Sequence, residues 1–142
     1  MDTVHKLLEN KGYDIWSVGP DASVYKAIEL MAEKGCGALL VMNGPELAGI
    51  ISERDYARKV ILAGRSSKSM NVHEIMTTAV LTAEPSHTVE HCLAVMTDNR
   101  IRHLPVVDDA KVVGMISIGD LVKAIIAKQQ FLISQLEQYI KQ

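Results

Sequence analysis

The chain contains two serine–aspartate pairs whose residue types and spacing suit a sugar and a phosphate. Ser52 precedes Asp55 by three residues, and Ser117 precedes Asp120 by the same spacing. In each copy an apolar run that predicts a strand ends at the serine, and a stretch with helical periodicity follows. A hydroxyl can donate to a phosphate, a carboxylate can accept from two adjacent sugar hydroxyls, and the free N–H groups of such a turn favour an anion. The two pairs therefore indicate nucleotide binding.

The same spacing also has a purely structural interpretation. A serine followed three residues later by an acid at a helix start is typical of a capping box, in which both side chains satisfy backbone N–H groups. A single copy of this pattern is more often a cap than a binding site. Two copies, each with a glycine and a strand before it and with aspartate in place of the commoner glutamate, favour binding.

The two pairs belong to a tandem duplication in which equivalent residues are 65 positions apart. The equivalent positions include Pro20 and Pro85, Met31 and Met96, Leu39 and Leu104, and Gly49 and Gly114. A duplicated segment of this length predicts two similar subdomains. We expect the short helix near residues 3–10 to lie outside the repeat.

Each half predicts the element order β-α-β-β-α within an α+β fold. The expected strands are 15–18, 38–42, 47–52, 80–82, 104–107 and 112–117, and a helix is expected over 53–62. The expected domains are an N-terminal helix (1–13), the first repeat (14–64), the second repeat with its linker 65–70 (65–127) and a C-terminal helix (128–142). The last repeat helix either continues into that C-terminal helix or restarts there.

Composition sets modest bounds on partners and location. With 15 basic and 17 acidic residues, the formal net charge of −2 gives no bulk attraction to nucleic acid or to an anionic membrane. The absence of a long apolar span and of a leader pattern makes the cytoplasm the expected location. Cys36 and Cys92 align with Ile101 and Ala27 in the other half, which predicts small buried hydrophobes without redox chemistry.

Three ordered motifs make each half resemble a CBS domain. They are the runs 74–77 (EIMT), 102–107 (RHLPVV) and 114–120 (GMISIGD), and the resemblance covers residues 14–127. The pair is similar to a Bateman module, in which two CBS domains pack through their sheets about a pseudo-twofold axis. In the first half, residues 37–40 (GALL) stand where the second half has 102–105 (RHLP), so the first half departs from the usual motif.

The resemblance implies a binding module for AMP, ADP, ATP, NAD(H) or S-adenosylmethionine. It implies that Asp55 and Asp120 hold ribose hydroxyls and that the adjacent serines approach phosphate. The residues expected to flank the adenine are Ile50, Met115, Ser17 and Thr82. The resemblance implies no catalytic residues, no required cofactor and no metal.

Four basic side chains are expected to serve phosphates: Arg54, Arg58, Arg102 and His103. Because the two sites of such a module share a cleft, these side chains could converge on phosphates from opposite sides. The alternative for Arg58 and its neighbour Lys59 is an ordinary solvated helix face, and the sequence leaves both interpretations open.

A second motif predicts different chemistry. Residues 87–91 fit the H-x-x-E-H pattern of a zinc peptidase, with His87 and His91 one helical turn apart. The equivalent positions in the first half are Ala22 and Lys26, and no downstream acidic ligand is evident. We therefore expect both histidines to lie on a solvent face.

Two classes of function follow. The first is an adenine-nucleotide sensor that regulates a separate enzyme or transporter by a change of conformation. The second is an interaction or assembly protein with a vestigial nucleotide site. Apolar stripes in both terminal helices, at Val4, Leu7 and Leu8 and at Leu132, Leu136 and Ile140, favour a homodimer, and the alternative is that they cover the sheet edges of the module itself.

Overall fold

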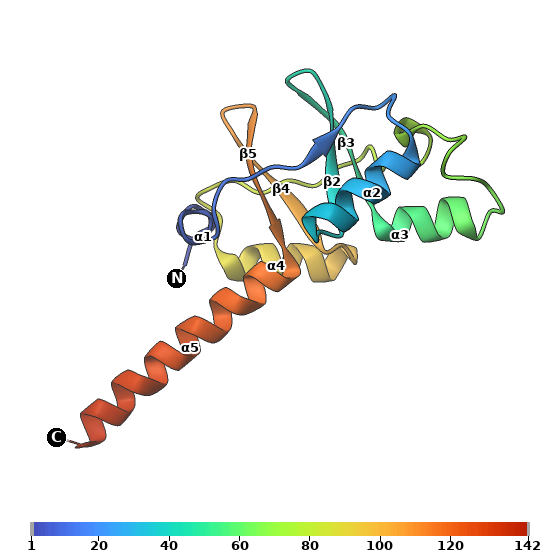
Figure 1. Ribbon diagram of the computed structural model, residues 1–142. Coiled ribbons are helices and arrows are strands. Elements are labelled where there is room, and N and C mark those ends of the chain that lie inside the picture. Colours follow the sequence, from blue (N-terminus) through green and yellow to red (C-terminus); the bar gives the residue numbers. More distant parts are fainter. Residues whose placement is uncertain (1, 142) are drawn as a thin grey trace. The chain divides into compact units, whose positions relative to one another are not determined.

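A computed structural model of the chain describes residues 2–141 (Figure 1). Met1 and Gln142, which the expected terminal segments include, lie outside the described residues. The chain divides into two compact units. The N unit is Ile15–Leu81 and contains the first serine–aspartate pair, whereas the C unit combines Met1–Asp14 with Thr82–Gln142 and contains the second. The predicted α+β fold with paired repeats is confirmed.

A three-stranded sheet and one long helix form the frame of the N unit. Its elements are β1 (Ser17–Val18), α2 (Val24–Lys34), β2 (Ala38–Asn43), β3 (Glu46–Ser52), α3 (Glu53–Tyr56), the π-helix η1 (Ala57–Ile61) and the 3-10 helix η2 (Val72–Glu74). The strand order is β1-β2-β3, with β1 parallel and β3 antiparallel to β2. Helix α2 begins at the predicted cap Ser23, which accepts from the Lys26 N–H at 3.1 Å. It ends at Gly35, whose φ of 65° is the left-handed geometry that glycine adopts readily.

The helix expected over 53–62 consists of two parts. The four α-helical residues of α3 continue into η1, a π-helical segment of five residues. The core of the N unit lies between these helices and the sheet and contains Val24, Ala27, Met31, Leu39, Val41, Ile51, Val60, Met70, Val72 and Ile75. The buried positions of α2 repeat at helical spacing, as the apolar pattern predicts.

The C unit is built on a two-stranded hairpin and three helices. Its elements are α1 (Val4–Lys11), α4 (Val89–Asn99), β4 (His103–Asp108), β5 (Lys111–Ser117) and α5 (Ile118–Lys141). Asp109 and Ala110 close the hairpin with φ of 52° and 63°, the geometry of a type I′ turn. The strand expected over 80–82 does not form. Instead, Ala83 makes a single parallel bridge to Val106.

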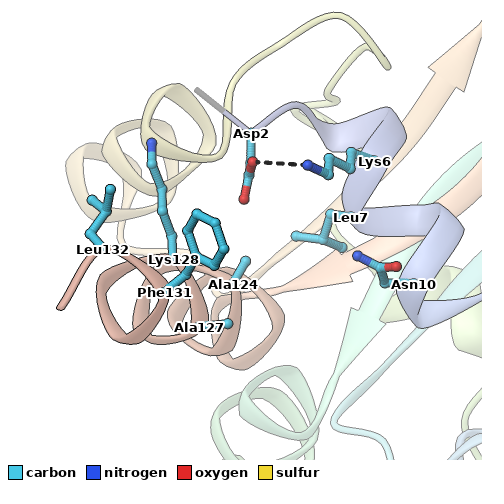
Figure 2. A pocket seen from close by; sticks show the side chains of 9 residues that line it. All are labelled: Asp2, Lys6, Leu7, Asn10, Ala124, Ala127, Lys128, Phe131 and Leu132. Atoms are coloured by element: carbon cyan, nitrogen blue, oxygen red, sulfur yellow. Dashed lines mark ion pairs between the residues drawn. The ribbon is translucent and has the colours of Figure 1, made fainter. Parts of the chain in front are cut away.

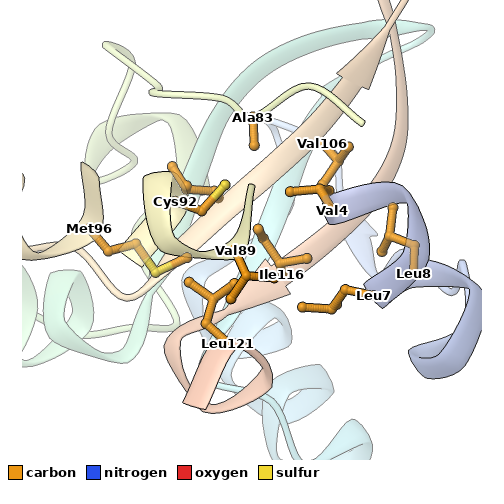
Figure 3. Packing of buried hydrophobic residues seen from close by; sticks show 11 residues of the cluster. Val4, Leu7, Leu8, Ala83, Val89, Cys92, Met96, Val106, Ile116 and Leu121 are labelled. Atoms are coloured by element: carbon orange, nitrogen blue, oxygen red, sulfur yellow. The ribbon is translucent and has the colours of Figure 1, made fainter. Parts of the chain in front are cut away.

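Helix α5 is one continuous helix of 24 residues. Because no glycine or proline occurs after Gly119, nothing in the sequence ends the helix at residue 128. The core of the C unit brings together side chains from α1, α4, the hairpin and the start of α5 (Figure 3). Its members are Val4, Leu7, Leu8, Ala83, Val89, Cys92, Met96, Leu104, Val106, Ile116 and Leu121.

The N-terminal segment makes the same backbone contacts in the C unit that residues 70–76 make in the N unit, and its place outside the repeat stays a prediction. The Val4 N–H donates to the His87 carbonyl at 2.8 Å, and the Val72 N–H donates at the same distance to the carbonyl of Ala22, the equivalent of His87. The bonds from His5 to Pro85 and from His73 to Pro20 repeat this pattern, at 2.9 and 3.0 Å. Residues 2–8 therefore do in the C unit what residues 70–76 do in the N unit.

The same kind of close contact occurs in both units. Leu8 packs against Gly114 in the C unit, and Met76 packs against the equivalent Gly49 in the N unit. Each half thus contacts a segment that lies outside its own expected domain. The boundaries at 13/14 and 64/65 come from the sequence duplication, and as limits of independently folding domains they stay predictions.

Candidate functional site

In the N unit, Ser52 and Asp55 contact each other directly. The Ser52 N–H and hydroxyl donate to Oδ2 of Asp55 at 3.0 and 3.1 Å, and the Asp55 N–H donates to the Ser52 Oγ at 3.2 Å. Strand β3 ends at the serine and α3 begins at the next residue, so both groups lie at the strand-to-helix turn. The other carboxylate oxygen, Oδ1, lies 3.2 Å from the Lys59 Nζ. Asp55 is buried, with 8% of the residue exposed.

In the C unit, Ser117 and Asp120 repeat this arrangement with a different lysine. The Ser117 N–H donates to Oδ2 of Asp120 at 2.8 Å, and the Asp120 N–H donates to the Ser117 Oγ at 3.2 Å. The ammonium of Lys11, the last residue of α1, lies 2.6 Å from the same Oδ2. Lys11 also donates to the Met115 carbonyl on β5. The structure thus places an ammonium against each motif aspartate.

The electrostatics of the C unit follow from these contacts. Burial raises the pKa of the Asp120 carboxyl, but the hydrogen bonds from Lys11 and Ser117 and the charge of Lys11 outweigh burial and lower the pKa overall. The pKa of His103 is lowered by burial first, then by the positive charges of Lys11 and Arg102, against the opposing effect of Asp120. At neutral pH the site therefore holds an ionised carboxylate and a neutral imidazole.

Both serine–aspartate pairs form helix caps. In the N unit both halves of a capping box are present, and the same reciprocal bonds join Ser117 and Asp120. The structural interpretation of the motif is therefore correct as far as local geometry goes. Because a carboxylate has about four acceptor positions, a cap bond does not exhaust its capacity for ribose hydroxyls. The ligand role of these four residues stays a prediction.

Three of the four residues expected beside adenine lie on strands. In the N unit, Leu40 pairs with both Ser17 on β1 and Ile50 on β3, so these two residues flank Leu40 in one row across the sheet. In the C unit, Met115 pairs with Pro105. Thr82 lies instead in a hollow of about 440 Å³ near the hairpin turn, lined in part by Glu84 and Asp109. The adenine contacts of all four residues stay predictions.

The expected phosphate-binding side chains are divided between the units. Arg54 on α3, Arg58 on η1 and Arg102 before β4 are exposed, whereas His103 is half-buried at the start of β4. Their convergence on one phosphate stays a prediction. Sequence reasoning identified Lys59 only as a neighbour of Asp55 and missed Lys11 altogether. The similarity of the segments at Val4–His5 and Val72–His73 is the signal that could have brought α1 into the site.

A separate hollow of about 460 Å³ lies between α1 and α5 (Figure 2). Apolar side chains from both helices line it, and polar groups surround them, with the Lys6 and Asp2 side chains 3.7 Å apart. Its lining residues are Asp2, Lys6, Leu7, Asn10, Ala124, Ala127, Lys128, Phe131 and Leu132. It does not include the serine–aspartate pair.

The H-x-x-E-H motif gathers no metal-binding cluster. The rings of His87 and His91 lie with their centroids 4.6 Å apart, and Nδ1 of His87 accepts from the Glu84 N–H at 3.0 Å. Within residues 2–141 no group of three or more histidine, cysteine or acidic side chains could hold a metal ion. Burial raises the pKa of the Cys92 thiol to about 11, which fits the predicted role as a small buried hydrophobe.

None of the helices formed within residues 2–141 has both the length and the apolar character needed to span a bilayer.

With the repeats and both turns described, comparison with known proteins identifies the family. The CBS domain family matches residues 10–61 and 72–127, which is most of the chain. The chain therefore belongs to the CBS domain family and carries two CBS domains in tandem.

The chain is similar to other proteins with CBS domains. It is 41% identical, over 149 aligned positions, to the CBS domain-containing protein CBSX3, mitochondrial, of Arabidopsis thaliana, covering 98% of this chain and 72% of that protein. A solved structure of a protein with CBS domains from Burkholderia ambifaria superposes with a TM-score of 0.86 at 55% identity, over 89% of this chain and 96% of that one.

A third comparison concerns a liganded protein. The CBS domain pair of MJ0100, solved in complex with 5′-methylthioadenosine and S-adenosyl-L-methionine, superposes with a TM-score of 0.79 at 25% identity. The match covers 90% of this chain and 98% of that one.

Proposed function

We propose that this protein is a regulatory module that binds adenosine-containing nucleotides and passes their occupancy to a separate partner protein. The observation that carries this proposal is the repeated serine–aspartate pair, which stands at the same strand-to-helix turn in both units. Membership of the CBS family and the adenosyl ligands of the MJ0100 pair support it. The ligand class comprises AMP, ADP, ATP, NAD(H) and S-adenosylmethionine.

The mechanism assigns one task to each group. The carboxylates of Asp55 and Asp120 accept bonds from the two ribose hydroxyls, and the hydroxyls of Ser52 and Ser117 donate toward phosphate. The ligand performs no chemistry. It shifts a conformational equilibrium by the difference between its affinities for the two conformations, and the partner protein responds to that shift.

The competing proposal is an interaction or assembly protein whose nucleotide site is vestigial. The capping boxes favour it, because they give both aspartates a structural role without any ligand. Calorimetric titration of the chain with AMP, ADP, ATP, NAD(H) and S-adenosylmethionine separates the two proposals. The sensor predicts saturable heat with at least one of them, whereas the assembly protein predicts none.

The same module forms a homodimer through α5. Residues 129–141 are exposed along their whole length, including Phe131 at 62%, Leu136 at 62% and Ile140 at 79%. An isolated helical end of this kind is marginal in water unless a partner covers its apolar face. Two helices of 24 residues packed along ~30 Å bury on the order of 1,200 Å² in total, the lower bound of a specific interface.

Charge favours an antiparallel pairing of two copies. Pairing centred between Leu132 and Ile133 brings Glu137 of one copy opposite Lys128 of the other, twice by symmetry. It also carries the apolar end of each α5 over the hollow between α1 and α5 of its partner copy, where Ala124 and Ala127 leave room (Figure 2).

The cytoplasmic location stays a prediction.

A further inference from the structure

Lys11 contacts two groups near the predicted ligand site, the side-chain carboxylate of Asp120 and the backbone carbonyl of Met115. Its ammonium lies 2.6 Å from Oδ2 of Asp120, the predicted ribose acceptor, and donates to the carbonyl of Met115, the predicted neighbour of adenine. The Lys11 and Asp120 side chains are 34% and 20% exposed, so the ion pair is partly shielded from water. If Asp120 accepts bonds from ribose hydroxyls, this ammonium competes with them for the same carboxylate.

The N unit also places a lysine on its aspartate, but from a different position in the chain. Lys59 lies 3.2 Å from Oδ1 of Asp55 and donates to the Ile75 carbonyl at 2.8 Å. The residue equivalent to Lys59 in the second repeat is Ala124, which cannot form an ion pair. The C unit therefore obtains its lysine from α1. Two unrelated positions supply the same charge to equivalent carboxylates, which argues for a role of that charge at the site.

The two lysines are not equally free to move. Lys59 follows Asp55 by four residues on the same helical segment, so its ion pair is local. Lys11 ends α1 at Gly12, whose φ of 105° turns the chain away, and reaches Asp120 from a separate element. Its long flexible stem lets the ammonium leave the carboxylate without unfolding the core contacts of Leu7 and Leu8.

Several charged groups lie near Lys11. The charges of Lys11 and Arg102 both lower the pKa of His103, and the charge of Asp120 raises it. If ribose hydroxyls take the carboxylate, Lys11 loses its anionic partner, and an uncharged ligand offers no replacement. A ligand phosphate restores a charge-assisted hydrogen bond to the ammonium.

We propose that Lys11 makes the C-unit site selective for adenosine ligands that carry phosphate, first by competing with ribose for Asp120 and then by pairing with the phosphate. The inference rests on the proposed function, because it concerns the ligand of the same site. With Lys11 in place, the C-unit site is expected to prefer AMP and ADP over adenosine and 5′-methylthioadenosine, which have the same ribose and adenine but no phosphate.

The test is a calorimetric titration in an Asp55→Ala background, which weakens the N-unit site so that the C unit dominates the titration. In this background AMP binds at least about tenfold more tightly than adenosine. Lys11→Met, which keeps the apolar stem without the charge, brings the two affinities together by weakening AMP and by maintaining or strengthening adenosine. Lys11→Arg retains a cation and preserves the preference. Thermal unfolding of each variant shows that the fold is intact.

The outcomes separate this inference from the proposed function. Equal affinities for AMP and adenosine in the Asp55→Ala background, or an unchanged ratio in Lys11→Met, overturn the selectivity role of Lys11 while leaving nucleotide binding in place. A parallel loss of both ligands in Lys11→Met assigns the lysine a structural role only and also overturns it. No binding of any adenosine compound overturns the proposed function and this inference with it. If Lys11→Met does not fold, equal affinities for AMP and adenosine in the Asp55→Ala chain still overturn the inference.

Discussion

Leu8 of α1 packs directly on Gly114 of β5. A Cβ placed on Gly114 would lie 2.9 Å from Cδ2 of Leu8, closer than real Cβ contacts allow. The N unit has the same relationship between Met76 and Gly49, but there the Cβ would also lie 2.7 Å from the backbone carbonyl oxygen of Thr77. Both glycines therefore allow a segment from outside the expected domain to approach a strand closely.

Glycine substitutions at these two positions have graded effects. Gly49→Ala destabilises the chain by about 1–3 kcal/mol because a backbone oxygen cannot move aside, and Gly114→Ala costs less because the end of the Leu8 side chain can. Urea unfolding measures both. Gly19→Ala is the matched control, since nothing lies within 4 Å of its added Cβ. Equal stability of all three variants would show that the close packing is absent.

The N-terminal helix contributes to the core of the C unit. Leu8 is 1% exposed, so Leu8→Ala leaves a cavity that lowers the free energy of unfolding by about 2–5 kcal/mol. Asn10→Ala, on the exposed side of the same helix, changes it by less than about 0.5 kcal/mol. Chemical denaturation compares the two. A small effect of Leu8→Ala contradicts the assignment of α1 to this unit.

Stability depends on pH through His103. Its pKa is lowered in the folded state from the ordinary value of 6.5, so the unfolded chain binds more protons between the folded and unfolded pKa values. Its contribution to stability is present above pH 6.5 and is lost as the pH falls toward the folded pKa. His103→Ala, which introduces the residue that Ala38 provides in the first repeat, removes this part of the profile. Melting temperatures of both chains between pH 5 and pH 8 test the sign.

The thiol of Cys92 is unreactive in the folded protein. Because burial raises its pKa to about 11, the thiolate that reacts with disulfide reagents is scarce at pH 8. In a Cys36→Ser background, labelling at pH 8 is slow and becomes fast only in denaturant. Rapid labelling of the native chain is inconsistent with the buried position.

The proposed dimer depends on the C-terminal half of α5. Leu136→Glu places a charge in the apolar stripe and is expected to convert the proposed dimer to a monomer, while Gln130→Glu adds the same charge on another side of the helix and leaves the mass unchanged. Light scattering after size exclusion measures the mass. A monomeric parent chain contradicts the dimer, and a dimeric Leu136→Glu variant excludes this helix as its interface.

Much of the fold follows from periodicity and from the internal repeat. The repeat aligns Ser52 with Ser117 and Asp55 with Asp120, and it correctly predicts two equivalent strand-to-helix turns. The place of α1 escaped prediction because its relationship to residues 70–76 has a different offset from the 65-residue repeat and involves few identical residues. Lys11 escaped prediction because its contact with Asp120 depends on tertiary packing that local spacing does not encode. The two-residue strand β1 and the single bridge at Ala83 lie at the limit of what alternation can predict.

The central claim is that each motif aspartate accepts hydrogen bonds from ribose hydroxyls. A thermodynamic cycle tests it most directly, with AMP and its 2′,3′-dideoxy analogue titrated into the parent chain and into Asp120→Ala, both with Asp55→Ala. The account predicts that losing either the carboxylate or the hydroxyls weakens binding by about 1.5–3 kcal/mol, and that losing both costs little more than losing one. Equal affinity for AMP and its dideoxy analogue in the parent chain, or an Asp120→Ala variant that binds AMP as tightly as the parent, would contradict it and leave the aspartate as a helix cap.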